Sequence, residues 1–231
     1  MKSTLQTATL LAALLAGGSA MALDVAIVRN AGYYSGSGGE FTLGPVPASW
    51  SYGYDSVATH TIGRGTGIQT FCLEKDEFVQ ANPHQAVVNA AGVAYGGGVN
   101  TDSGDAISKG TAWLYEKFSG GTLDDLGYDY TPGAGRETTA AALQNMIWAL
   151  EDEQSVDLGN MFYDDLVTKF GSYAAAKADN LGEFSAGVLN ITKDGEPAQD
   201  MLIRVPDAGS TLGLLGLGLA GVAAARRRKT A

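Results

Sequence analysis

The sequence has 231 residues, 45% of them hydrophobic, and a formal net charge of −10. Between residues 23 and 206 there are ten basic and 24 acidic side chains, which makes the net charge of that part −14. A surface so acidic has no basic face for a polyanion, which argues against nucleic acid and an anionic membrane surface as partners. It is compatible with an exported, soluble protein.

The first 22 residues have the pattern of a secretory signal peptide. Lys2 supplies the positive charge, residues 8–16 form a short apolar run, and Ala20-Met21-Ala22 is an A-x-A cleavage site. We therefore expect residues 1–22 to be removed. About 180 residues then remain before the C-terminal tail, enough for one domain with its own hydrophobic core.

The first half of this domain favours strands. Alternating apolar residues predict strands over 24–28, 57–62 and 67–73, the last two joined by a turn at Gly63-Arg64-Gly65. Residues 32–39 and 41–54 are rich in Gly, Ser and Pro, which is typical of loops and irregular segments. Residues 85–95 fit a strand or a helix, of which we expect the strand, and a loop follows at 96–104.

The second half favours helices and then a hairpin. Apolar spacing predicts helices over 105–118 and 141–150, a helix from an Asn160 cap through 170, and a short helix beyond Gly171. Residues 184–191 and 198–205 alternate around Asp194-Gly195, a strong hairpin signal. The predicted fold class is α+β: an antiparallel sheet or sandwich over residues 23–204 with an inserted helical subdomain.

Two positions within this domain are candidates for chemistry. Cys72 is the only cysteine, so in an exported protein it is a buried hydrophobe, an intermolecular bridge or a reactive group. Gln144 lies in an apolar helix and shares a face with Trp148, four residues later. A buried, unpaired amide costs about 1–3 kcal/mol, so Gln144 requires a partner or a special use.

The motifs around these residues resemble the two signatures of bacterial internal-thioester domains. Phe71-Cys72-Leu73 fits aromatic-Cys-apolar, and residues 143–148 fit apolar-Gln-x-x-apolar-Trp. The resemblance implies a β-structure with a helical subdomain, in which Cys72 and Gln144 join as a thioester with loss of ammonia. Phe71 and Trp148 would shield that bond from water. The family's further Thr-Gln-x-Ala signature is absent from this sequence.

The same resemblance implies a function without cofactor or turnover. An amine or hydroxyl of a surface partner or exopolysaccharide would attack the former Gln144 carbon and release the Cys72 thiol, so the protein would be a covalent adhesin and not an enzyme. The alternative is a structural envelope or biofilm-matrix protein with the same fold and no thioester. In that case Cys72 belongs to the core and Gln144 bonds to a backbone group.

Other chemistries have weaker signals. A cysteine hydrolase would use Cys72 with His60 or His84 as the base, but neither histidine has a recognisable motif. Three consecutive acids, residues 151–153, point in different directions on a helix, so we expect a solvated helix end and no metal. Scattered aromatic residues allow sugar stacking but more often serve packing: Trp50, Tyr52, Tyr128 and Tyr130.

The C-terminal tail carries the most specific signal. Its motif consists of Val205, Pro206, Asp207 and Gly209, followed by an uncharged segment at 211–225 and the basic residues Arg226, Arg227, Arg228 and Lys229. This tail resembles PEP-CTERM sorting signals in the Val-Pro-Asp-x-Gly variant. The resemblance implies that an exosortase-type transpeptidase recognises residues 205–231.

The tail also implies a route through the cell. As a helix, the uncharged segment would be about 22–27 Å long, short for a hydrocarbon core of ~30 Å. The basic cluster would stay cytoplasmic. We expect the protein to pass through the inner membrane, anchored by this helix, and to reach the cell surface or extracellular matrix. An ordinary tail anchor is the alternative.

Overall fold

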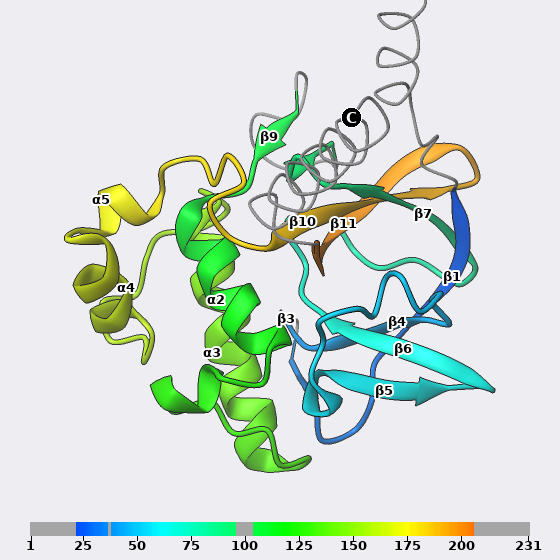
Figure 1. Cartoon of the computed structure of the whole chain (residues 1–231), viewed down its shortest axis with the longest axis horizontal. Coiled ribbons are helices and arrows are strands. Elements are labelled where there is room, and N and C mark those ends of the chain that lie inside the picture. Colours follow the sequence, from blue (N-terminus) through cyan, green and yellow to red (C-terminus); the bar gives the residue numbers. More distant parts are fainter. Residues whose placement is uncertain (1–21, 37, 96–103, 206–231) are drawn as a thin grey trace, which may run out of the picture.

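The computed structural model describes residues 22–36, 38–95 and 104–205, and its architecture is α+β. Helices gather on one side of a seven-stranded sheet (Figure 1). The predicted signal peptide, except residue 22, and the predicted membrane segment at 211–225 lie outside the described residues. Within the described ranges, no helix is both long and apolar enough to cross a membrane.

The main sheet has the strand order β11-β10-β7-β1-β4-β6-β5, and its neighbouring strands pair antiparallel. Its strands are β1 (Leu23–Val28), β4 (Phe41–Gly44), β5 (Thr59–Ile62), β6 (Gly65–Thr70), β7 (His84–Asn89), β10 (Ala186–Lys193) and β11 (Glu196–Arg204). Two small antiparallel pairs stand apart: β2 (Tyr34–Ser35) with β3 (Gly38–Gly39), and β8 (Val93–Ala94) with β9 (Asp105–Ala106).

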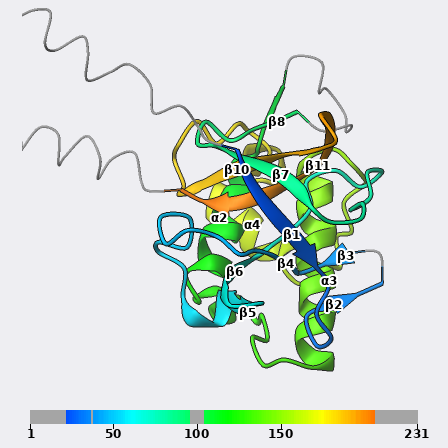
Figure 2. The same ribbon diagram turned by 90° about the vertical axis from the view of Figure 1, so that its right-hand side faces the viewer.

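The main sheet bends at β1 and closes on itself. The first half of β1 pairs with β7 and the second half with β4, so this strand passes from one part of the sheet to the other (Figure 2). After β6 the chain returns to the far edge, where the Leu202 N–H donates to the Phe71 carbonyl at 3.2 Å and Cys72 pairs with Met201. The architecture is therefore one bent, closing sheet and not two separate sheets of a sandwich.

The helices are inserted between β9 and β10, as predicted. They are α2 (Lys109–Ser119), α3 (Ala134–Leu150), α4 (Tyr163–Phe170) and α5 (Tyr173–Ala176), together with the 3-10 turn η3 (Leu123–Leu126). A further 3-10 turn, η1 (Ser56–Ala58), lies between β4 and β5. Helix α2 begins four residues later than the apolar spacing predicted, because Asp105–Ala106 pairs with β8 and the Ser108 hydroxyl caps the helix. The Asn160 side chain accepts a hydrogen bond from Phe162 N, just ahead of α4.

The predicted C-terminal hairpin is confirmed, and it packs on the segment that carries Cys72. β10 and β11 pair through Lys193 opposite Glu196, with Asp194 and Gly195 in the turn at φ 54° and 90°. Positive φ at both central positions is the geometry that Asp-Gly favours in two-residue hairpins. The strand predicted over 85–95 is confirmed in part, because β7 ends at Asn89 and, after a turn, residues 93–94 form β8 of a separate small sheet. By contrast, the glycine-rich run at 32–39, predicted as loop, contains the β2–β3 hairpin.

Of the three acids at the end of α3, only Asp152 is exposed, so the solvated end that the sequence predicted is confirmed for that residue alone. Glu151 is partly buried, and its carboxylate accepts a hydrogen bond from Ser108 N at 3.2 Å. It therefore lies at the N-terminus of α2, where unpaired N–H groups and the helix dipole favour an acid. Asp152 pairs with Lys177, and Glu153 accepts from Lys75 N at 3.0 Å.

A buried ion pair joins the start of α3 to the sheet. Arg136 is 1% exposed and Glu40 is fully buried. The guanidinium donates to both carboxylate oxygens, at 2.6 and 2.8 Å, and to the Val57 carbonyl at 2.7 Å. The Tyr128 hydroxyl donates to the same carboxylate. Every charged group of this cluster thus has close partners, a condition for burying charge at acceptable cost.

Replacing Arg136 with Ala should destabilise the fold strongly, because Glu40 would remain buried without its counter-ion. We expect a loss of about 3–5 kcal/mol in the free energy of unfolding, measured by urea denaturation. Lys109→Ala is the control. It breaks the more exposed Lys109–Glu183 pair at 2.6 Å and should cost about 0–1 kcal/mol. Equal losses in the two variants would contradict the structural role of the buried pair.

Candidate functional site

Two hydrogen bonds hold the Gln144 side chain against the backbone of Cys72. The Cys72 N–H donates to Gln144 Oε1 at 3.0 Å, and Gln144 Nε2 donates to the Cys72 carbonyl at 2.8 Å. Both residues are buried, with exposed fractions of 3% and 0%. The structure therefore brings together the two residues singled out in the sequence and supplies the partners that a buried amide needs. We call this arrangement the carboxamide clamp.

The clamp also fixes the orientation of the amide. Cys72 lies just beyond β6, pairs with Met201 of β11, and meets α3 through Gln144. In an extended residue the N–H and C=O lie in the plane of the strand, whereas Cβ projects out of it. The carboxamide therefore lies beside the Cys72 backbone, in the plane of its hydrogen-bonding groups, and the Cys72 side chain projects from that plane.

The surroundings keep the Cys72 thiol neutral. Burial raises the pKa of Cys72 well above its usual value, and the Glu74 carboxyl adds to the rise, while Arg29 opposes it. A reactive thiolate normally needs a lowered pKa from a nearby cation or base. The raised pKa therefore disfavours the thiolate form of Cys72.

Neither histidine is arranged as a base for Cys72. His60 packs edge-on against Tyr33, with ring centroids 5.3 Å apart, and His84 contacts Asn82 through Nδ1 at 3.2 Å. In the part of the chain that the structure describes, no hydrogen bond joins either ring to Cys72. The geometry therefore gives no support to the cysteine-hydrolase alternative.

The two predicted shielding residues lie on different sides. Trp148 is 4% exposed and belongs to the same apolar cluster as Cys72, together with residues of β1, β4 and β11. Phe71 belongs to the helical cluster and packs against Phe118, with ring centroids 4.9 Å apart. Adjacent residues of an extended segment face opposite ways, which explains the separation. Only Trp148 of this pair shares the cluster of Cys72, and shielding by Phe71 stays a prediction.

Gly38 of the β2–β3 hairpin contributes to the site, and sequence reasoning missed it. A Cβ built on Gly38 would lie 2.7 Å from Gln144 Cγ and 2.8 Å from Trp148 Cη2. The hairpin backbone therefore rests directly on the pair of α3 side chains. In the sequence this glycine is one of several in a Gly/Ser run, and nothing local distinguishes it.

Glu74 is a second group that the sequence did not reveal. It is 3% exposed, and its Oε2 accepts hydrogen bonds from Gln199 Nε2 at 2.6 Å and Asp200 N at 2.9 Å. Burial, and then the nearby Asp200 carboxylate, raise the pKa of Glu74 to about 9. Two residues from Cys72, this carboxyl is therefore protonated at neutral pH.

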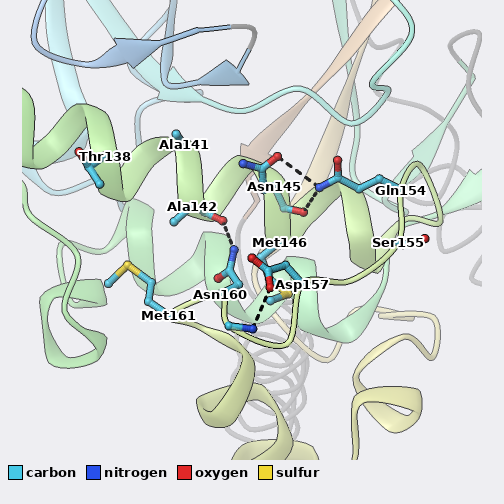
Figure 3. Close-up of a pocket in the computed structure, with 11 residues that line it drawn as sticks. Thr138, Ala141, Ala142, Asn145, Met146, Gln154, Ser155, Asp157, Asn160 and Met161 are labelled. Atoms are coloured by element: carbon cyan, nitrogen blue, oxygen red, sulfur yellow. Dashed lines mark hydrogen bonds between the residues drawn. The ribbon is translucent and has the colours of Figure 1, made fainter.

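A pocket of about 600 Å³ opens between α3 and the segment that follows it (Figure 3). Three carboxamides on its wall are held by hydrogen bonds. Gln154 Nε2 donates to the Asn145 backbone carbonyl at 2.8 Å and to Asn145 Oδ1 at 3.2 Å, and Asn160 Nδ2 donates to the Ala142 backbone carbonyl at 2.8 Å. Lys75 Nζ reaches Gln154 Oε1 at 2.8 Å. The pocket wall thus connects to residues next to Gln144 and close to Cys72.

The remaining predicted site residues lie at the C-terminus. Val205 is buried beside the sheet cluster, while the rest of the sorting motif and the basic stop at 226–229 lie outside the described residues. Residues 204–229 match the VPDSG-CTERM motif. The chain carries a PEP-CTERM-like exosortase sorting signal. This signal implies that the protein is exported and passes through the membrane to the cell surface.

The match to a known protein family covers the sorting signal at residues 204–229. No curated protein and no solved structure matches the chain. The interpretation of the residues before the signal therefore depends on the carboxamide clamp and its surroundings. In the described ranges no three His, Cys, Asp or Glu residues are grouped to hold a metal ion.

Stability should fall with rising pH because of Glu74. Its pKa rises from 4.5 to about 9 on folding, so between these values the folded state binds more protons than the unfolded chain. The free energy of unfolding should therefore decrease as pH rises, by at most about 1.4 kcal/mol per pH unit.

Glu74→Gln should flatten this slope, since Gln stays uncharged and retains an acceptor for Gln199 and Asp200. Urea denaturation across the neutral and alkaline range measures the effect. Glu183→Gln, at a surface carboxyl paired with Lys109, is the control and should leave the slope unchanged. An unchanged slope in Glu74→Gln would show that other groups cause the pH dependence.

Proposed function

We propose that this surface-sorted protein attaches covalently to a partner through an internal thioester between Cys72 and Gln144. The carboxamide clamp carries the proposal. It holds the amide beside the only cysteine of the chain, at 2.8 and 3.0 Å from the Cys72 backbone, inside a buried site. Permanent proximity of this kind replaces the encounter of two reactants and lowers the barrier of a bond-forming step.

Bond formation uses groups that are already in place. The Cys72 sulfur attacks the Gln144 side-chain carbon, and the carbonyl electrons move onto Oε1. The Cys72 N–H, which donates to Oε1 at 3.0 Å, stabilises the negative charge that develops there. The C–N bond then breaks, and the departing nitrogen takes up the thiol proton and leaves as ammonia. No redox partner or cofactor takes part.

Attachment to the partner is a second acyl transfer, at the same Gln144 carbon. An amine or hydroxyl of the partner attacks the thioester carbon, forms an amide or ester with the former Gln144 side chain, and returns a proton to the Cys72 sulfur. The Cys72 thiol is released, and the protein stays bound to its target. Because each molecule reacts once, the protein is consumed and does not act as an enzyme.

The pocket of Figure 3 offers a partner a place along α3, although neither Cys72 nor Gln144 lines it. Asn145 follows Gln144 directly, and Gln154 is hydrogen-bonded to Lys75, three residues after Cys72. Carboxamide and hydroxyl groups on its wall both donate and accept hydrogen bonds, which suits the hydroxyls of a polysaccharide. An exopolysaccharide of the extracellular matrix is therefore the partner class that we favour.

The clamp alone also supports a second candidate function. Two hydrogen bonds to the Cys72 backbone satisfy the buried Gln144 amide completely in a purely structural role. The protein would then be a non-covalent component of the envelope or biofilm matrix, with the same fold and the same sorting signal.

The intact mass of the purified domain separates these functions. Thioester formation expels ammonia, so the mass should be about 17 Da below the calculated value. Methylamine should then add to Gln144 and free one thiol for alkylation. A full calculated mass with a thiol that is alkylated from the outset, once the chain is unfolded, would contradict the covalent mechanism.

Cys72→Ala and Gln144→Ala are the matched variants, because each removes one partner of the bond. Both should show the full calculated mass and no methylamine adduct. Asn145→Ala, next to Gln144 but outside the clamp, should keep the mass deficit. Loss of the deficit in Asn145→Ala as well would show that general disturbance of α3, and not a missing reactive group, prevents the bond.

The sorting signal predicts removal of the tail. In material from the native host, peptide mapping should find a C-terminus between residues 205 and 210 and an N-terminus at residue 23. Asp207→Ala should leave uncut protein in the membrane fraction. Mature surface protein that still carries Arg226 to Lys229 would contradict processing by an exosortase.

A further inference from the structure

Gly38 stands where no other residue fits. Its φ is outside the left-handed range that favours glycine, unlike those of Gly36 at 63° and Gly39 at 129°. The backbone conformation therefore does not require glycine at position 38. The lack of space at position 38 requires glycine, because a Cβ there would lie within 2.8 Å of both Gln144 and Trp148. The side chain is absent so that the hairpin backbone can rest on these two residues.

The chain on both sides of the hairpin is fixed to the helix that carries Gln144. Before β2, Gly32 N donates to Glu137 Oε1 at 2.9 Å, and Gly133 N donates to the Gly32 carbonyl at 3.0 Å. After β3, Glu40 forms the buried ion pair with Arg136. Glu137 and Arg136 belong to α3, and Gly133 is its N-cap residue. Strands β2 and β3 are thus held across the Gln144–Trp148 pair from both ends.

We propose that Gly38 is a specificity-determining residue. By allowing β2 and β3 to close on Gln144 and Trp148, it keeps the reactive carbon buried, so that small nucleophiles reach it more readily than bulky ones until a partner displaces the hairpin. This inference rests on the proposed thioester. It adds a steric selection that protects the bond before the partner arrives and favours a partner able to bind beside the hairpin.

The test compares two amines on the thioester form of the whole domain. Methylamine is the small nucleophile and benzylamine the bulky one, and mass spectrometry follows both adducts. Gly38→Ala should push the hairpin away from Gln144 and lower the methylamine-to-benzylamine rate ratio by about tenfold, equivalent to about 1.4 kcal/mol. Hydrolysis of the thioester should also become faster.

Glu137→Ala keeps the inference testable if Gly38→Ala disturbs thioester formation itself. It removes the bond to Gly32 N without altering Gln144, Trp148 or Cys72, and should lower the rate ratio in the same direction. Glu183→Ala removes a surface carboxylate that pairs with Lys109 and should leave the ratio unchanged.

The outcomes separate the two proposals. A wild-type domain with the full calculated mass overturns the proposed thioester, and this inference with it. A wild-type domain with the mass deficit, but with the same rate ratio in Gly38→Ala and Glu137→Ala, overturns the role of Gly38 alone. A lowered ratio in Glu183→Ala as well would assign the effect to general loosening of the fold and would also overturn it.

Discussion

The carboxamide of Gln144 is the contact on which the rest of the site depends. It bonds to both polar groups of the Cys72 backbone and so occupies the place that a neighbouring strand would otherwise take. One side chain thereby ties α3 to the closing edge of the sheet. Since both ends of the contact are buried, neither group can exchange its partner for water without unfolding. The same contact supplies the hydrogen bonds that the buried amide needs and holds that amide beside Cys72.

Buried polar groups elsewhere serve to hold α3 in place. At its start, the Arg136–Glu40 pair joins it to the strand that follows the hairpin. At its end, Glu151 accepts a hydrogen bond at the N-terminus of α2, so an acid that is unfavourable for its own helix is favourable for the next. The helix is therefore fixed at both ends, and Gln144 between them is held in register with Cys72.

Export and the chemistry of the site fit one another. A protein passing to the cell surface enters an environment where a free thiol is at risk of oxidation or of bridging to another chain. Here Cys72 is buried and its pKa is raised, both of which disfavour the reactive thiolate, and its hydrogen-bonded neighbour is an amide. The sorting signal brings the protein to the surface, and the buried pair proposed here would attach it to what lies there.

The sequence by itself determined the features that are encoded locally. The Asp194-Gly195 turn, the apolar spacing of α3 and the linear VPDSG-CTERM motif are each written in consecutive residues, so pattern alone predicts them. Only the tertiary structure decided the contact of Gly38 with Gln144 and Trp148 and the placement of Glu151. Both depend on contacts with residues far away in the chain, and a periodic pattern carries no information about which distant surfaces meet. The same holds for the clamp: its residues were visible in the sequence, but folding brought them together.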